Sequence, residues 1–194
     1  MALASGVPAL ASAQQGGDDL RLGFGAVLDF AGQVEADFPG PGGSPDDHLK
    51  LTPGFRVHLD YDVHKYVSIG GMFRLAAWES DDDWEDRSLL FDLLLRITGH
   101  YDWRDFRFYL ALTIGPTISK LNTDFDDAYR NGAVGVAASL TPGVEWWFSR
   151  RAGLFLEMFG WTGHYFSHEI EDTNADVDFS LNQVTWQMGI VIGL

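Results

Sequence analysis

Apolar and polar residues alternate along most of this chain. The clearest example is the last stretch, residues 183–194, in which every second residue from Val184 to Ile192 is apolar. A period of two is typical of a β-strand with one apolar face and one polar or tightly packed face. The same alternation predicts eight strands, with expected bounds 20–31, 49–63, 66–78, 88–101, 106–119, 132–148, 152–166 and a last strand that follows residue 178 and runs to Leu194.

The strand over residues 152–166 alternates less regularly than the others. If Glu157 shares the face of the other charged residues, then Phe155, Phe159 and Trp161 share that face too. A β-bulge near Gly160 or Gly163 would restore the alternation, because one inserted residue exchanges the two faces. This strand is therefore the one whose orientation the pattern leaves open.

The charged residues within the predicted strands fall on one row. Eleven of these residues are Arg21, Asp29, Arg56, His58, Asp60, Arg74, Asp92, Arg96, Arg107, Glu145 and Glu157. The opposite row is apolar, which is the arrangement expected when that row faces hydrocarbon, where a mid-bilayer Arg or Lys costs about 2–4 kcal/mol. Eight strands enclose a space that side chains nearly fill, so the enclosed charges must pair. We expect a lumen network in which Arg56, Arg74, Arg96 and Arg107 interleave with Asp60, Asp92, Glu145 and Glu157.

The connections between the predicted strands alternate between short and long. Tight turns are expected at residues 64–65, 102–105 and 149–151, and loops at 32–48, 79–87, 120–131 and 167–178. Short turns at one end and longer loops at the other are typical of an outer-membrane barrel. The loops carry most of the 28 acidic residues, whereas the turns carry Lys65, Arg104, Arg150 and Arg151.

Composition excludes several functional classes. The net charge of −15 argues against nucleic-acid binding, which needs Lys and Arg for phosphate contacts. The chain has no cysteine, so disulfides and thiolate metal sites are excluded, and no sequence motif for a metal or another cofactor is present. Residues 1–13 resemble the end of a secretory signal, with Ala11 and Ala13 around a cleavage site, and residues 14–19 read as a linker. Residues 1–19 are thus expected to precede one domain over 20–194.

Aromatic residues cluster near the predicted strand ends. Such residues form girdles at the two membrane–water interfaces of barrels. The expected girdle residues are Tyr61, Tyr66, Tyr101, Trp103, Trp146 and Phe148 at the turn end, Trp78, Trp161, Tyr165 and Phe166 at the loop end, and Trp186 in the last strand.

One group of residues has the composition of a catalytic site. His164, Ser167, His168 and Glu169 resemble the Ser/His/acid set of lipid A deacylase barrels. Their spacing differs from that family's arrangement, and neighbouring residues of one strand point to opposite faces. We therefore expect no catalytic residues and no enzyme, with a lipid-modifying hydrolase kept as an alternative.

The carboxy-terminal residues carry a further pattern. Outer-membrane barrels end in a polar residue, then glycine, then two aromatic positions, and here Gln187, Gly189, Ile192 and Leu194 occupy these places, with aliphatic residues at the last two. Together with the succession of predicted hairpins and the alternation of short turns with long loops, this pattern makes residues 20–194 resemble the small eight-stranded outer-membrane barrels of the OmpA, OmpW and opacity type. The resemblance implies an all-β, antiparallel, up-and-down transmembrane barrel.

The same resemblance implies a location and partners. It implies a protein of the bacterial outer membrane, in contact with outer-membrane lipid and lipopolysaccharide, and inserted by the barrel-assembly machinery through the four carboxy-terminal residues. The implied role is structural, a narrow pore opened by rearranging salt bridges, or contact with a surface partner through the acidic loops. A soluble lipocalin-like barrel is the remaining alternative, and it would place apolar residues inside and charges outside.

Overall fold

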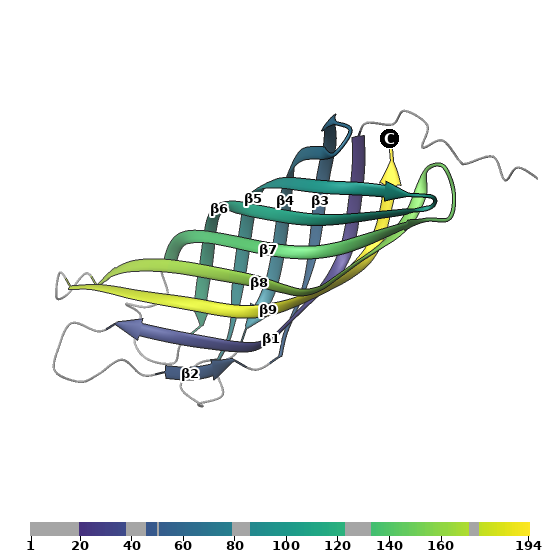
Figure 1. Ribbon diagram of the computed structural model, residues 1–194. Helices are drawn as coiled ribbons and strands as arrows, with labels where there is room; N and C mark the ends of the chain where they lie inside the picture. The colour runs from purple at the N-terminus through teal and green to yellow at the C-terminus, as the bar shows by residue number, and fades with distance from the viewer. Residues whose placement is uncertain (1–19, 38–45, 50, 79–85, 123–132, 171–174) are drawn as a thin grey trace, which may run out of the picture.

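The computed structural model describes residues 20–37, 46–49, 51–78, 86–122, 133–170 and 175–194, and these residues form one closed sheet (Figure 1). Its strands are β1 (Leu20–Asp37), β2 (Asp46–Leu49), β3 (Thr52–His64), β4 (Val67–Trp78), β5 (Asp86–Trp103), β6 (Phe106–Asn122), β7 (Ala133–Trp147), β8 (Ala152–Ile170) and β9 (Ala175–Gly193). Each long strand pairs antiparallel with its neighbour along the chain, and β1 also pairs with β9. The predicted eight-stranded up-and-down barrel is therefore confirmed.

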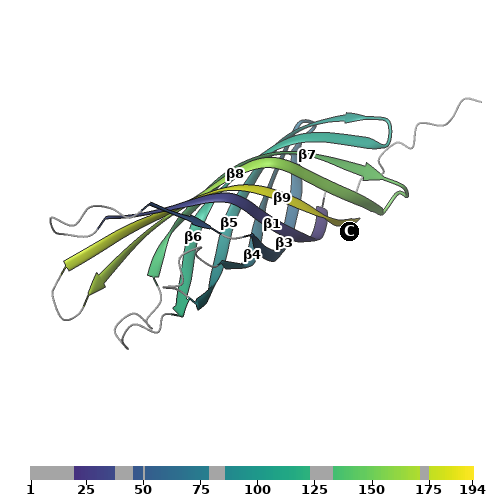
Figure 2. The same cartoon turned by 90° about the horizontal axis from the view of Figure 1, so that it is seen from below.

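The strands are longer at the loop end than alternation predicts. β1 continues to Asp37 and pairs there with the short β2, while β8 and β9 extend through most of the predicted loop 167–178. Figure 2 shows these extensions projecting beyond the rest of the sheet. Outside a membrane both faces of a hairpin meet water, so the alternation disappears although the backbone hydrogen bonds continue. The apolar pattern therefore marks only part of each strand.

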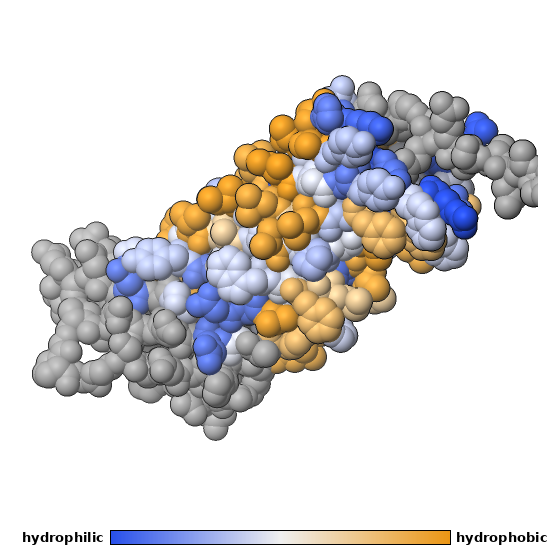
Figure 3. Space-filling view, in the orientation of Figure 1, coloured by the Kyte–Doolittle hydropathy of each residue, from blue (hydrophilic) through white to orange (hydrophobic). Residues whose placement is uncertain are grey.

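The barrel has an apolar exterior and a charged interior. Leu110, Val136 and Ile190 on the outer surface are 50%, 53% and 50% exposed, whereas Arg96 and Glu145 are 2% and 3% exposed. Figure 3 shows apolar residues, in orange, gathered across the middle of the face in view, and we call these outward apolar residues the apolar belt. This arrangement contradicts the lipocalin-like alternative, whose apolar residues would lie inside. Among the residues that the structure describes, no helix is long and apolar enough to cross a membrane.

A β-bulge explains the irregular alternation of apolar and polar residues in β8. The pairing of β8 with β9 shifts register between Glu157 and Gly160, and Phe159 within this shift has a φ of 56°. Phe155 and Glu157 point into the barrel as predicted, but Phe159, at 69% exposure, and Trp161 lie on the outer surface. The predicted bulge near Gly160 is thus confirmed, and the inward orientation of Phe159 and Trp161 is wrong because the inserted residue exchanges the faces.

The lumen contains apolar side chains as well as charges. Towards the loop end, Phe166 packs with Leu90, Leu181, Ala76 and Ala133, and all five are buried. A second buried cluster joins Met72, Leu94 and Ala137. Phe166 was expected in the loop-end girdle, and this placement is wrong because the bulge sets the faces of the second half of β8. The lumen is therefore a filled core with layers of different polarity.

Candidate functional site

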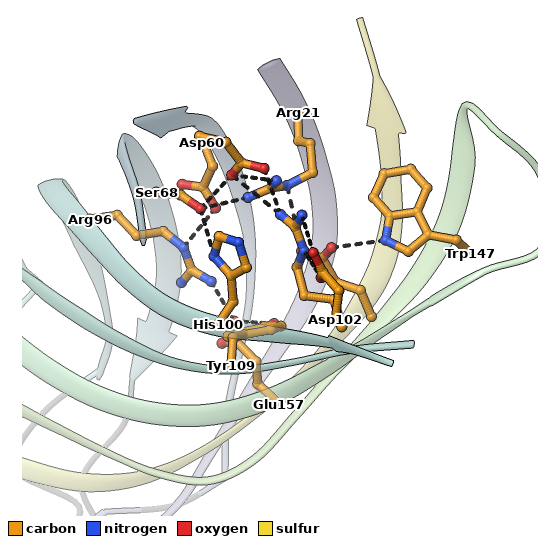
Figure 4. A network of polar contacts seen from close by, with 12 residues as sticks. Arg21, Asp60, Ser68, Arg96, His100, Asp102, Tyr109, Trp147 and Glu157 are labelled. Atoms are coloured by element: carbon orange, nitrogen blue, oxygen red, sulfur yellow. Dashed lines mark hydrogen bonds and ion pairs between the residues drawn. The ribbon is translucent and has the colours of Figure 1, made fainter. Parts of the chain in front are cut away.

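The middle of the lumen is built around one carboxylate. Glu157 of β8 accepts hydrogen bonds from Arg56 Nη1 and Nη2 at 2.6 and 2.8 Å, from Arg96 Nη2 at 3.0 Å, and from the Tyr109 hydroxyl at 2.7 Å. Arg96 Nε also donates to Asp60 Oδ2 at 3.2 Å. These donors come from β3, β5 and β6, so Glu157 joins four strands across the barrel. Figure 4 shows Arg96 and Tyr109 beside Glu157.

A second cluster closes the turn end of the lumen. Asp62 accepts hydrogen bonds from Arg21 Nη1 at 2.6 Å, Ser68 Oγ at 2.6 Å and Arg107 Nη1 at 3.1 Å. Arg107 Nε also donates to Asp102 Oδ1 at 2.7 Å. Glu145 lies beside this cluster, where it accepts a hydrogen bond from Trp147 Nε1 at 3.1 Å, and its Oε1 is 3.9 Å from Nε of the same Arg21 (Figure 4).

A third cluster lies towards the loop end. Arg74 Nη2 donates to Asp29 Oδ2 at 2.5 Å, and Arg74 Nε is 3.6 Å from Asp92 Oδ2. The other oxygen of Asp92 accepts from the Thr117 hydroxyl at 2.6 Å, and Nε2 of His164 lies 3.2 Å from Asp92 Oδ2. These contacts link β1, β4, β5, β6 and β8. They lie on the turn side of the apolar cluster around Phe166.

The structure places the eleven charged residues of the predicted row inside the barrel, but Arg107 and Glu145 do not pair within the expected set, since Glu145 lies beside Arg21. Each of these eleven residues is buried. Arg56 and Arg96 pair with Glu157, Arg96 with Asp60, and Arg74 with Asp92, as expected. Arg107 instead contacts Asp62 and Asp102, because all three lie near the turn end.

Sequence reasoning left out two acidic residues of the network. Asp62 shares the inward row of the predicted strand 49–63 but was not counted in the network, and Asp102 was assigned to a turn although it continues the inward parity of the strand before it. Their side chains are partly exposed at the turn end of the lumen. Continuing the inward parity to the last residue of each strand would have identified them.

His164 and Ser167, two members of the alternative Ser/His/acid group, lie apart in the structure. His164 is buried in the lumen against Asp92, whereas Ser167 lies three residues further along β8 on the exposed face. The side chains of His168 and Glu169 lie outside the described residues. A nucleophile must reach its base by a hydrogen bond, and the wall of the barrel separates Ser167 from His164. Within the described part of the chain, no group of three or more His, Asp or Glu side chains is placed to hold a metal ion.

The predicted girdle lies on the outer surface at the turn end. Tyr61, Tyr101, Trp103 and Trp146 are all exposed there. Towards the loop end, Trp186 makes edge contacts with Phe30 at 5.2 Å and Phe159 at 5.6 Å between ring centroids, so the bulge adds a ring to this girdle. The side chain of Trp78 lies outside the described residues.

The four residues of the expected assembly signal are divided between the two faces of β9. Gln187 is buried in the lumen, and Gly189 lies opposite Gly25 of β1. Ile192 and Leu194 are exposed on the outer surface. Recognition of this strand by the assembly machinery stays a prediction.

Replacing Gly143 with alanine is expected to destabilise the barrel by about 1–3 kcal/mol, because small-to-large changes in a packed core force side chains to move. A Cβ at Gly143 would lie 2.4 Å from Cζ of Tyr109 and 2.6 Å from its hydroxyl oxygen, and Tyr109 is held by its hydrogen bond to Glu157. Equilibrium urea unfolding in lipid vesicles measures the change. The control is Gly99→Ala, since a Cβ at Gly99 meets nothing within 4 Å. Equal unfolding free energies for the two variants would contradict the prediction.

Solved structures of outer-membrane barrels share this fold. Neisserial surface protein A (NspA) is 11% identical to this chain, with 91% of this chain and 97% of that chain covered and a TM-score of 0.53. OprG from Pseudomonas aeruginosa is 10% identical, with 89% and 94% covered and a TM-score of 0.54. At such identities the likeness shows the fold alone. No curated protein matches the chain.

A family model described as the outer membrane protein beta-barrel domain matches residues 1–191. This match covers nearly the whole chain, including every strand of the sheet apart from the last residues of β9. The apolar belt and the enclosed charges agree with this assignment, since a barrel in a bilayer must be apolar outside. The chain therefore belongs to the outer membrane protein beta-barrel domain family and is a protein of the bacterial outer membrane.

Proposed function

We propose that this protein is a closed outer-membrane barrel with a structural role, neither an open diffusion pore nor an enzyme. The observation that carries the proposal is the position of Glu157, whose carboxylate meets donors from three other strands in the middle of the lumen. The cluster around Asp62 lies on one side of this layer, and the clusters around Asp92 and Phe166 lie on the other. A solute would have to displace all of these layers.

The enclosed ion pairs support a structural role in a specific way. Buried pairs contribute little net stability, because desolvation of the charges offsets their attraction. Removing one member of a pair is nevertheless costly, so the network disfavours any register in which an Arg and its acid are separated. We expect these pairs to select one closed barrel among alternative strand pairings.

The apolar belt, the last strand and the acidic loops each suggest a class of partner. Outer-membrane lipid and lipopolysaccharide would contact the apolar belt, and the barrel-assembly machinery would recognise the last strand through Ile192 and Leu194, which are exposed. The acidic loops offer a surface for a partner outside the cell, although their residues fall largely outside the described part of the chain. No nucleic-acid partner is proposed, given the net charge of −15.

Planar-bilayer recording tests the closed barrel. We expect the wild-type protein to show no sustained open level across voltage and pH, because Glu157 and Phe166 are both fully buried in a filled lumen. Insertion is verified separately by the heat-dependent shift of the folded barrel on a gel. A sustained conductance from inserted wild-type protein would refute the proposal.

A gated narrow pore is the second candidate, and the incomplete hydrogen bonding of the middle layer favours it. Asp60 Oδ1, Arg56 Nε and His58 Nδ1 are buried and have no hydrogen-bond partner among the described residues. Unpartnered buried polar atoms cost free energy, so a rearranged set of pairs would lie close in energy to this one. Brief openings that depend on voltage would favour this candidate over the permanently closed barrel.

A further inference from the structure

The three tight turns at one end of the barrel form a cationic rim. Lys65 lies between β3 and β4, Arg104 between β5 and β6, and Arg150 and Arg151 between β7 and β8, and all four side chains are exposed. Asp105 is the one acidic residue between these strands, and Asp102 near the end of β5 is partly exposed at the same end but pairs with Arg107. Hydrophilic residues lie beyond the apolar belt at this end of the molecule, where the carboxy terminus also lies (Figure 3, Figure 1). The rim is therefore positive on a protein that is strongly acidic overall.

Aromatic rings fix the depth of the cationic rim. Lys65 Nζ lies 5.0 Å from the centroid of the Tyr66 ring, and Arg104 Cζ lies 5.1 Å from that of Trp103. Exposed tyrosine and tryptophan side chains of a barrel sit at the level of the lipid headgroups. The cations beside them thus lie at the level of the lipid phosphates, within reach of the molecules that surround the turns.

The two-residue turn between β5 and β6 sets the backbone of Arg104. Arg104 has a φ of 58°, in the left-handed region that favours Gly, Asn or Asp in a two-residue hairpin turn. Its side chain lies over the Trp103 ring. A two-residue hairpin turn requires a positive φ at its first central residue, so the turn accounts for this backbone, and an arginine occupies a place that usually holds Gly, Asn or Asp.

We propose that the cationic rim binds the headgroups of anionic phospholipids in the membrane leaflet that surrounds the turns. The phosphate oxygens of such a lipid would accept hydrogen bonds from the Arg guanidinium groups in a bidentate geometry and from the Lys65 ammonium group. The proposal rests on the outer-membrane location and not on whether the lumen conducts. The acidic loops at the opposite end would repel the same lipids, so the charge asymmetry would favour one orientation of the barrel.

Lipid association measured with spin-labelled lipids tests this binding. The full-length protein is reconstituted in phosphatidylcholine bilayers that contain spin-labelled phosphatidylglycerol or, in parallel, spin-labelled phosphatidylcholine. We expect phosphatidylglycerol to associate with the barrel about threefold or more strongly than phosphatidylcholine at low salt, since one Lys or Arg near a membrane surface contributes about 1 kcal/mol, or roughly fivefold. The preference should decline towards 1 M salt, where screening acts over about 3 Å.

Charge-removing variants locate the binding. The variant with Lys65, Arg104, Arg150 and Arg151 all replaced by glutamine should lose the preference for phosphatidylglycerol. In a matched pair of single changes, Lys65→Gln should reduce the preference, whereas Lys120→Gln should not, because Lys120 is exposed at the loop end of β6. All of these side chains are exposed, so each variant is expected to fold, and the heat-dependent gel shift verifies this.

Three results would overturn the proposal. The first is equal association of the two lipids with the wild-type protein. The second is an unchanged preference in the folded quadruple variant. The third is an equal loss of the phosphatidylglycerol preference in Lys120→Gln and Lys65→Gln. That result would indicate a response to net charge and not to the cationic rim. The bilayer recordings of conductance are independent of all three, so the closed-barrel proposal stands or fails separately.

Discussion

Glu157→Gln is expected to destabilise the barrel by about 3–5 kcal/mol, the largest effect we predict for a single change in the lumen. Gln preserves the volume of the side chain but removes the charge that Arg56 and Arg96 share. Both guanidinium groups are buried and would be left without that carboxylate, and the Tyr109 hydroxyl would compete with them for one amide oxygen. Equilibrium urea unfolding in lipid vesicles, followed by tryptophan fluorescence and by the gel shift, measures the loss.

The control removes the same charge from the surface. Asp105→Asn alters an exposed turn residue and should change the unfolding free energy by no more than about 0.5 kcal/mol. A loss of under about 1 kcal/mol for Glu157→Gln would contradict the central position that the structure gives this carboxylate, since breaking a fully buried pair costs several times as much.

Leu112→Arg is expected to cost about 2–4 kcal/mol, because the substitution places a charge on the lipid-facing surface near the middle of the bilayer. Leu112 is exposed in β6 and lies between Ile97 of β5 and Leu140 of β7 in the apolar belt. The arginine would find no acidic partner among these neighbours and would have to reach towards the headgroups. The same unfolding experiment in vesicles measures the cost.

The matched substitution is Val63→Arg, close to the end of β3. Val63 is as exposed as Leu112 but lies beside the turn at the level of the aromatic girdle. There the expected cost is only about 0–1 kcal/mol, because water and headgroups solvate the charge. If both substitutions cost the same free energy, Leu112 and Val63 would not lie at different depths in the membrane. The apolar belt would then not be centred where we place it.

Much of the candidate site could be predicted from residue parity. A side chain's face follows from its position in a strand, so Arg56, Asp92 and Glu157 were placed inside without any coordinates. Partners could not be predicted in the same way, because the pairing of Arg107 with Asp62 depends on height within the barrel and on reach across it. The network at the turn end was incomplete for this reason.

The second half of β8 illustrates the limit of parity. A bulge was expected near Gly160, but the sequence did not show which residue would be inserted, and Phe159 takes a φ of 56° that is unusual for a bulky side chain. That one residue sends Trp161 to the lipid face and Phe166 into the lumen. An apolar cluster inside a charged lumen was therefore not foreseen.

The sequence by itself determined the class of fold, the inward row of charges and the apolar outer surface, because hydrocarbon penalises a misplaced charge at every lipid-facing position. Only the tertiary structure decided which acid meets which arginine, where the apolar layer lies and how far the strands continue beyond the belt. These features depend on register and on contacts across the barrel, and a period of two along one strand carries no information about either.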